Sequence, residues 1–158
     1  MHFLVKALGL SYVICLKIAP EPLGGQLVQN MKYSIDKQDK YAVFQVQEKN
    51  LNSLVAPELK SQFVILYNEG VKNFILDLSP VEFVDSSGLS AILTADRLWK
   101  EVGSFILTGV AHDAVKKLIE ISQLQTVLTI IPTVSESIDY VFMEEIEKEL
   151  GADSDKEE

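Results

Sequence analysis

The stretch "VEFVDSSGLS" at residues 81–90 holds the residues whose types and spacing could do chemistry. An apolar run stops at Asp85, two hydroxyls follow at Ser86 and Ser87, and Gly88 precedes an apolar series with helical spacing. A serine at such a junction can act as a nucleophile or cap the helix. Asp and Ser are both preferred caps, so a purely structural role is open. One cap suffices for one helix, however, and three side chains compete for it here.

A catalytic role for these serines would need a base that the sequence scarcely provides. No G-x-S-x-G motif surrounds Ser86, because the position two residues before it is not glycine, and a Ser-His-Asp triad would have to recruit His112. That histidine is better explained as a surface residue at the start of a helix. The sequence has no Walker loop or G-x-G-x-x-G motif. We therefore predict no catalytic residues and no enzyme activity, with a small serine hydrolase as the catalytic alternative.

The composition argues against several classes of partner. The formal net charge is −9 and Arg97 is the single arginine, whereas nucleic-acid binding needs a basic surface. The same balance argues against adhesion to an anionic membrane. Cys15, His2 and His112 are too few and too far apart for a metal site. The sequence predicts no metal, no cofactor, and no direct nucleic-acid or membrane partner. It is compatible with a reducing, cytoplasmic setting.

Alternating strand and helix patterns after residue 30 predict an α/β fold. Charged turn residues between two apolar runs indicate a hairpin at the start, and short apolar runs then alternate with helical periodicity. The predicted strands cover 33–35, 41–46, 73–79, 104–109 and 127–131, and the predicted helices cover 56–70, 89–103, 112–124 and 133–150. This order predicts a single domain with a mixed four- to five-stranded sheet and about four helices packed on it.

The two ends of the chain differ from the middle. The apolar part of the first thirty residues is interrupted by Lys6 and Lys17, which makes it too short and too charged for a comfortable membrane span. We expect residues 1–30 to be a non-native extension or a poorly ordered leader, with a signal peptide or an integral part of the fold as alternatives. The domain is predicted to cover residues 31–150, and the acidic residues 151–158 are predicted to be a disordered tail.

The stretch "FILDLSPVEFVDSSGLSAIL" resembles the STAS domain, the fold of bacterial anti-anti-sigma factors. In that family an apolar strand ends in Asp-Leu, matched by Asp77 and Leu78. An aromatic or apolar pair, matched by Phe83–Val84, then precedes D-S-[ST]-G-L, matched by residues 85–89. "LNSLVAPELK" and "SFILTGVAHDAVKKLIEISQL" are similar to other parts of the family pattern, and the resemblance covers about residues 31–145. Ser90 stands where the family often has glycine, and "QEKNLN" replaces a G-E-[LI]-D stretch, which leaves the contacts of that loop open.

The resemblance implies a binding protein that is switched by phosphorylation. Family members bind an anti-sigma factor, often a serine kinase, and so free a sigma factor. The kinase phosphorylates the hydroxyl that matches Ser86, and a metal-dependent serine phosphatase reverses the step. The implied partner-binding residues are Asp85, Ser86, Ser87, Gly88 and Leu89, with Gly88 letting the partner approach the backbone closely. The expected function is a cytoplasmic anti-sigma factor antagonist that regulates transcription by partner switching.

A second role is open within the same family. Some STAS domains are non-switching subunits of lipid-transport ABC assemblies, where they brace an ATPase and retain a hydroxyl without obligatory phosphorylation. Co-purification with an ATPase–permease complex would favour this role, whereas a kinase-like anti-sigma factor as partner would favour the switch.

Overall fold

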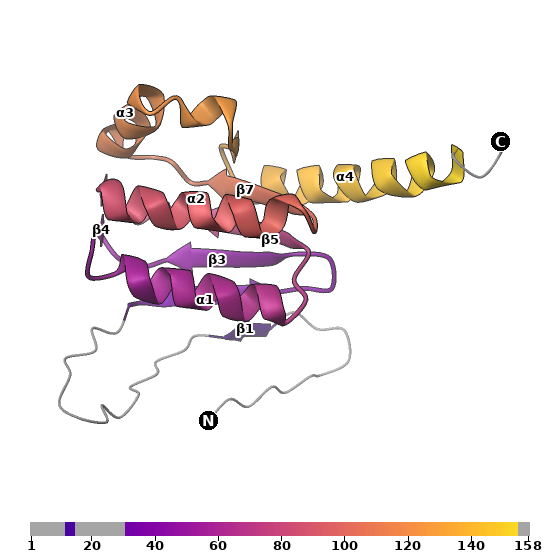
Figure 1. Cartoon of the computed structure of the whole chain (residues 1–158), viewed down its shortest axis with the longest axis horizontal. Helices are drawn as coiled ribbons and strands as arrows, with labels where there is room; N and C mark the ends of the chain where they lie inside the picture. The colour runs from indigo at the N-terminus through magenta and orange to yellow at the C-terminus, as the bar shows by residue number, and fades with distance from the viewer. Residues whose placement is uncertain (1–11, 15–30, 155–158) are drawn as a thin grey trace.

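The computed structural model describes residues 12–14 and 31–154 of the chain as an α/β fold (Figure 1). The strands are β1 (Tyr12–Ile14), β2 (Tyr33–Lys37), β3 (Ala42–Val46), β4 (Asn50–Leu51), β5 (Asn73–Asp77), β6 (Phe83–Val84), β7 (Ser104–Thr108) and β8 (Thr129–Ile131). The helices are α1 (Ala56–Asn68), α2 (Ser86–Lys100), α3 (Asp113–Ile121) and α4 (Val134–Ser154), with a 3-10 turn η1 at Leu124–Thr126.

The main sheet is mixed, in the order β1-β2-β3-β5-β7-β8. β2 and β3 pair antiparallel with Tyr33 opposite Val46, which confirms the predicted hairpin. β3, β5, β7 and β8 are parallel neighbours, as the alternation of strands and helices predicted. Every residue of β5 is buried, and this explains its continuous apolar run. The predicted fold class is therefore confirmed.

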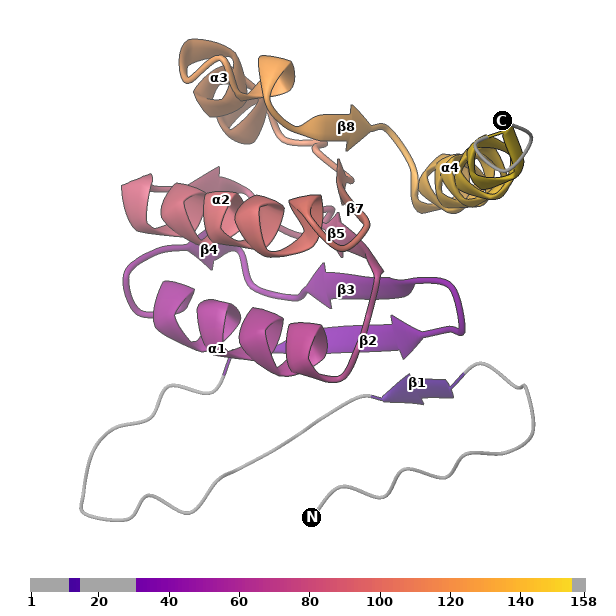
Figure 2. The ribbon, with the colours of Figure 1, turned by 45° about the vertical axis from the view of Figure 1, so that its right-hand side comes forward.

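One face of the sheet carries α1 and α2, which lie side by side over the larger core (Figures 1 and 2). The rings of Phe74 on β5 and Trp99 on α2 stack with centroids 4.3 Å apart, and Phe63 on α1 meets Phe74 edge-on at 5.3 Å. Trp99 Nε1 donates to the Val71 carbonyl oxygen at 2.9 Å, which satisfies the one polar atom of a fully buried ring. This cluster fixes both helices relative to the sheet.

The opposite face is covered by α4, which packs over β5, β7 and β8 (Figure 2). Its fully buried contacts are few: Ile75, Ile106 and Val141 form a small cluster. The end of the helix projects beyond the sheet (Figure 1), and it exposes a series of large apolar side chains. These are Phe142, Met143, Ile146 and Leu150.

A second, two-stranded sheet lies outside the predicted pattern. β4 pairs parallel with β6, with Asn50 opposite Phe83 and Leu51 opposite Val84. The apolar run before Asp85 did not predict this pairing, because each strand has only two residues and its partner is about thirty residues away. This small sheet holds the residues that lead into α2.

Several element boundaries differ from the prediction. α2 begins at Ser86, not at residue 89, because the serines belong to its first turn. The first two residues of the predicted strand 127–131 are irregular backbone after η1, so β8 begins only at Thr129. α4 continues to Ser154, four residues past the predicted end of the domain. Its first turn matches the predicted start, since the Thr133 hydroxyl oxygen accepts from Glu136 N at 3.2 Å.

The end segments are described only in part. Within residues 1–30, β1 pairs antiparallel with β2, placing Ile14 opposite Ile35, so at least three residues of the expected leader join the sheet. The rest of the expected leader and residues 155–158 of the expected tail lie outside the described residues. Among the described helices, none has the length and apolar character needed to cross a membrane.

Candidate functional site

The start of α2 is capped by Asp85, which has an extended backbone at φ −97° and ψ −174°. Its Oδ1 accepts from the Gly88 backbone N–H at 3.0 Å, and its carbonyl oxygen accepts from Leu89 N at 2.9 Å. The competition among three candidate caps is therefore decided for the aspartate. In the part of the chain that the structure describes, the hydroxyls of Ser86 and Ser87 make no hydrogen bond, so both serines remain available for another role.

The loop between β3 and α1 holds this junction in place. The Lys49 carbonyl oxygen accepts from the backbone N–H groups of Glu82 and Phe83, at 2.7 and 3.1 Å. The Leu51 carbonyl oxygen accepts from Asp85 N at 3.0 Å. This is the "QEKNLN" loop, whose contacts the sequence left open. Its backbone forms the hydrogen bonds, which explains why side chains that depart from the family pattern are compatible with this role.

Gly88 is buried and packs against its own chain, which corrects the expectation that it admits a partner. A Cβ atom there would lie 2.6 Å from the Leu51 carbonyl oxygen, 2.7 Å from Leu51 Cβ and 3.0 Å from Val84 Cγ1. Any side chain would push α2 away from β4 and β6. The glycine therefore allows the close approach of helix and loop, and not of helix and partner.

The other expected site residues differ in exposure. Asp85 and Ser86 are exposed, whereas Ser87 is half-buried. Leu89 is half-buried and packs against the larger core, so only part of its side chain is open to a partner. Of the expected acceptors, Ser86 is thus the more accessible.

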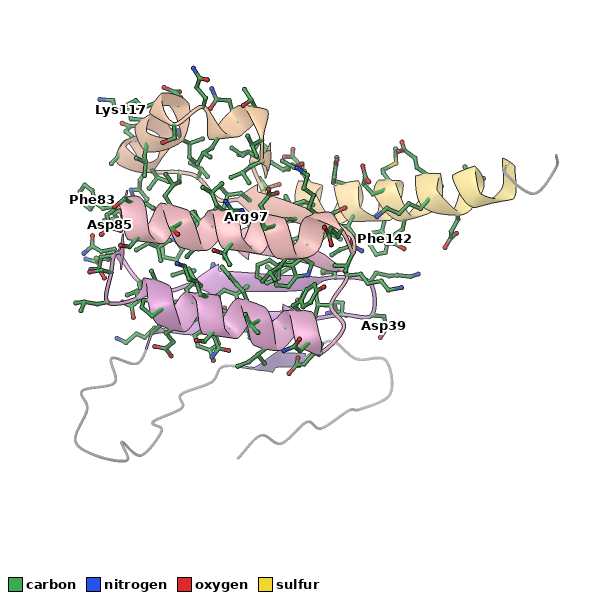
Figure 3. The ribbon with its side chains drawn as sticks, in the orientation of Figure 1. Asp39, Phe83, Asp85, Arg97, Lys117 and Phe142 are labelled. Carbon is green, nitrogen blue, oxygen red and sulfur yellow. The ribbon has the colours of Figure 1, made fainter. Side chains whose placement is uncertain are left out.

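Two exposed apolar side chains near this junction were not predicted as site residues. Phe83 on β6 is 59% exposed and Leu54, just before α1, is 58% exposed. Figure 3 shows Phe83 and Asp85 together at the end of the molecule where α2 begins. Exposed aromatic side chains often anchor protein–protein interfaces. The aromatic residue of "EFVD" is visible in the sequence. The sequence does not show, however, whether its side chain points to solvent or into the core.

A shallow depression of about 280 Å³ lies between the starts of α1 and α2. It is lined by Ser53, Ala56, Pro57 and Lys60 from the first helix region and by Ser86, Ser87 and Ser90 from the second. Lys60 Nζ donates to Ser90 Oγ at 3.3 Å. Lys60 was not predicted as a site residue, because thirty residues separate it from Ser90 and nothing local links the two helices.

Asp77 of the family motif is an interior residue with its carboxylate fully engaged. Gln45 Nε2 donates to Oδ2 at 2.9 Å, and Ser79 donates to Oδ1 through both its backbone N–H and its hydroxyl. This carboxylate shapes the turn after β5. It makes no contact with the serine pair.

The described residues place neither a histidine bonded to the serine pair nor a metal-ligating cluster at this junction. His112 precedes α3 and no hydrogen bond joins it to Ser86, so the base that a serine hydrolase needs is not in place. Within residues 12–14 and 31–154, no group of three His, Cys, Asp or Glu side chains is arranged to hold a metal ion.

Comparisons with known proteins give a consistent result. The STAS domain family model matches residues 32–137. An anti-sigma factor antagonist from Mycobacterium paratuberculosis has a similar structure, with a TM-score of 0.62, 24% identity and coverage of 71% of this chain and 94% of that one. The Bacillus cell fate determinant SpoIIAA in its phosphorylated form is similar with a TM-score of 0.55 and 21% identity, covering 69% of this chain and 98% of that one.

The fold also occurs in a protein of a different class. A sulfate transporter family protein from Wolinella succinogenes matches with a TM-score of 0.58 and 18% identity, covering 66% of this chain and 87% of that one. At such identities the structural matches show the fold alone, so the choice among roles depends on the residues of the site.

Proposed function

The chain belongs to the STAS domain family, and on that premise we propose that it is an anti-sigma factor antagonist switched off by reversible phosphorylation of Ser86. The proposed partners are an anti-sigma factor with serine kinase activity and a serine phosphatase, acting in the cytoplasm. The protein has a binding role and no catalytic one. The observation that carries the proposal is the exposed Ser86 hydroxyl in the first turn of α2, released from capping by Asp85.

The kinase step would use Ser86 as the nucleophile. A bond forms between Ser86 Oγ and the γ-phosphorus of ATP, the bond from that phosphorus to the bridging oxygen breaks, ADP leaves and the hydroxyl proton is released. The phosphatase returns the hydroxyl by transferring the phosphoryl group to water. Both reactions need an accessible oxygen, and Ser86 meets this need better than the half-buried Ser87.

Phosphorylation would act on the interface without unfolding the domain. The new group carries a charge of about −1.5 to −2 and is favoured at a helix N-terminus, so α2 tolerates it. Asp85 already makes this surface negative. A partner surface that fits a neutral hydroxyl offers no counter-charge to this bulky anion and would have to strip it of water, which favours dissociation. Phe83 and Leu54 supply apolar area beside this charge, as an interface of this kind needs.

The test compares charge at the site with the same charge elsewhere. Ser86→Ala is expected to bind the anti-sigma factor kinase of the same organism but to accept no phosphate. Ser86→Asp should weaken binding toward the low end of about 30- to 5,000-fold, because aspartate mimics only part of the phosphate charge. Ser135→Asp, at an exposed serine in the first turn of α4, is the matched control and should bind as wild type.

Phosphopeptide mapping after incubation with kinase and ATP completes the test. Phosphate is expected on Ser86 in the wild type and in Ser87→Ala. Phosphate on Ser87 alone, or undiminished binding by Ser86→Asp, would refute the switch. Co-purification with an ATPase–permease complex and unmodified Ser86 would instead support a non-switching transporter subunit.

A further inference from the structure

The depression beside the serine pair contains Lys60, whose ammonium has a hydrogen-bond partner but no carboxylate partner. Lys60 is half-buried in it, and its ammonium donates to the neutral Ser90 hydroxyl at 3.3 Å. No carboxylate in the described part of the chain lies within ion-pair distance of Lys60. A half-buried ammonium that contacts only a hydroxyl has capacity for an anion.

The helix geometry brings Ser86 to the same place. Ser86 and Ser90 are four residues apart in α2, so they share one face of the helix with Cβ atoms about 6 Å apart. Both border the depression that contains Lys60. A phosphoryl group on Ser86 extends farther than the hydroxyl that it replaces, into the depression that Lys60 and Ser90 also line.

We propose that Lys60 binds the phosphoryl group of phosphorylated Ser86, leaving the Ser90 hydroxyl to do so. The inference rests on the proposed function in taking Ser86 as the phosphorylated residue. It adds that α1 takes part in the switch. In the unphosphorylated protein Lys60 contacts Ser90, and in the phosphorylated protein it contacts the phosphate, so the surface presented to a partner changes on both helices.

The other cations on α2 are too distant to take this role. Arg97 and Lys100 lie 11 and 14 residues after Ser86, which corresponds to roughly 17 and 21 Å along the helix axis. Figure 3 shows Arg97 well away from Asp85 and the start of the helix. Lys100 therefore offers a matched control, because its substitution changes the net charge equally without changing the depression.

The test measures the phosphate group directly. Phosphoserine is installed at position 86 of the full-length chain during translation, and the second pKa of the phosphate, about 6 in the absence of neighbours, is measured by phosphorus NMR. A nearby ammonium favours the dianion, so Lys60→Gln is expected to raise this pKa by about half a unit relative to the wild type. Asp85, the cap next to Ser86, and Glu82 and Lys49 in the segments that pair at this junction are also charged, and they are the same in every variant.

The controls separate binding from general effects. Lys100→Gln should leave the phosphate pKa at the wild-type value, and Lys60→Arg should keep it low, because the charge is retained. An unchanged pKa in Lys60→Gln, or an equal rise in Lys100→Gln, would overturn the inference.

Neither a kinase nor a partner enters this measurement, so the inference and the proposed function can fail separately. If no kinase phosphorylates Ser86, the proposed function is wrong, yet Lys60 can still lower the pKa of an installed phosphate. If Ser86 is a working switch and the pKa does not respond to Lys60, only the inference is wrong.

Discussion

The two faces of the main sheet hold their helices in different ways. On the α1–α2 face, fully buried aromatic rings from both helices and from β5 pack into one cluster. On the α4 face, three aliphatic residues are fully buried together, and part of the attachment is polar. Asn73 Nδ2 donates to Glu145 Oε1 at 3.0 Å, and Lys40 pairs with the same carboxylate at 3.9 Å.

This difference relates structure to the proposed function. The serine pair belongs to α2, whose start is fixed by its cap, by the β4–β6 pairing and by the large core. A hydroxyl that a partner must recognise benefits from such a rigid support, because less ordering is needed on binding. α4 lies on the other face and makes no contribution to the depression. We therefore expect substitutions on the first face to affect stability and the site, and those on α4 to have small effects.

The largest difference between the two faces is expected when one aromatic ring is removed from each. Trp99→Ala should lower the free energy of unfolding by about 3–5 kcal/mol, because it leaves a cavity among Phe63 and Phe74. Phe142→Ala on α4 is the counterpart. Its ring is 44% exposed and meets Tyr41 edge-on, so the loss should be under about 1 kcal/mol. Chemical denaturation measures both values, and similar losses would contradict the comparison.

Two helical glycines should respond to the same substitution with opposite sign. Gly88→Ala should destabilise by about 1–3 kcal/mol, because the methyl group overlaps Leu51. At Gly151 in α4 a Cβ atom would meet nothing within 4 Å, so Gly151→Ala should stabilise by up to about 1 kcal/mol through helix propensity alone. Thermal unfolding gives the sign for each variant. A stabilising Gly88→Ala would show that α2 can shift away from the β4–β6 pair without cost.

The polar attachment of α4 should make a small contribution to stability that depends on pH. The hydrogen bond from Asn73 lowers the pKa of Glu145, with Lys148, Lys40 and Lys72 acting in the same direction and burial opposing them. A carboxyl whose folded-state pKa is lowered stabilises above its unfolded pKa of about 4.3, and this stability is lost as the pH falls through the folded value.

Comparing Glu145→Gln with the wild type by denaturation at several pH values tests this. The wild type should be the more stable at pH 7, and the difference should shrink as the pH falls below the unfolded pKa of about 4.3 and disappear below the lowered folded-state pKa. Glu149→Gln, at an exposed glutamate of the same helix, is the control and should show little difference at either pH. If the stability difference between the wild type and Glu145→Gln persists in acid, the difference arises from packing and not from charge.

The smallest effect is expected at the projecting end of α4. Ile146 is 52% exposed, so Ile146→Ala should change the free energy of unfolding by less than about 0.5 kcal/mol. Ile92→Ala on α2, where the side chain is 1% exposed, is the matched aliphatic substitution and should cost about 2–5 kcal/mol. A large loss for Ile146→Ala would show that this helix end is covered in solution.

Sequence patterns by themselves determined the hairpin, the buried strand β5, the alternation of the later main-sheet strands with the helices, and the junction at residues 85–88. These features depend on local signals: apolar periodicity, turn residues and cap preferences act over a few neighbouring residues. They also indicated a serine at a strand-to-helix connection, although not which of three side chains would take the cap.

The tertiary structure decided the rest, because it depends on residues that are distant in the sequence. The pairing of Leu51 with Val84 buries Gly88. The sequence suggested that a partner could approach this glycine, but the loop of its own chain covers it. The packing of α1 beside α2 brings Lys60 to Ser90 across thirty residues. Neither contact has a local signature, since each strand of the small sheet is too short to show a period and a single lysine on a helix reads as a solvated surface residue.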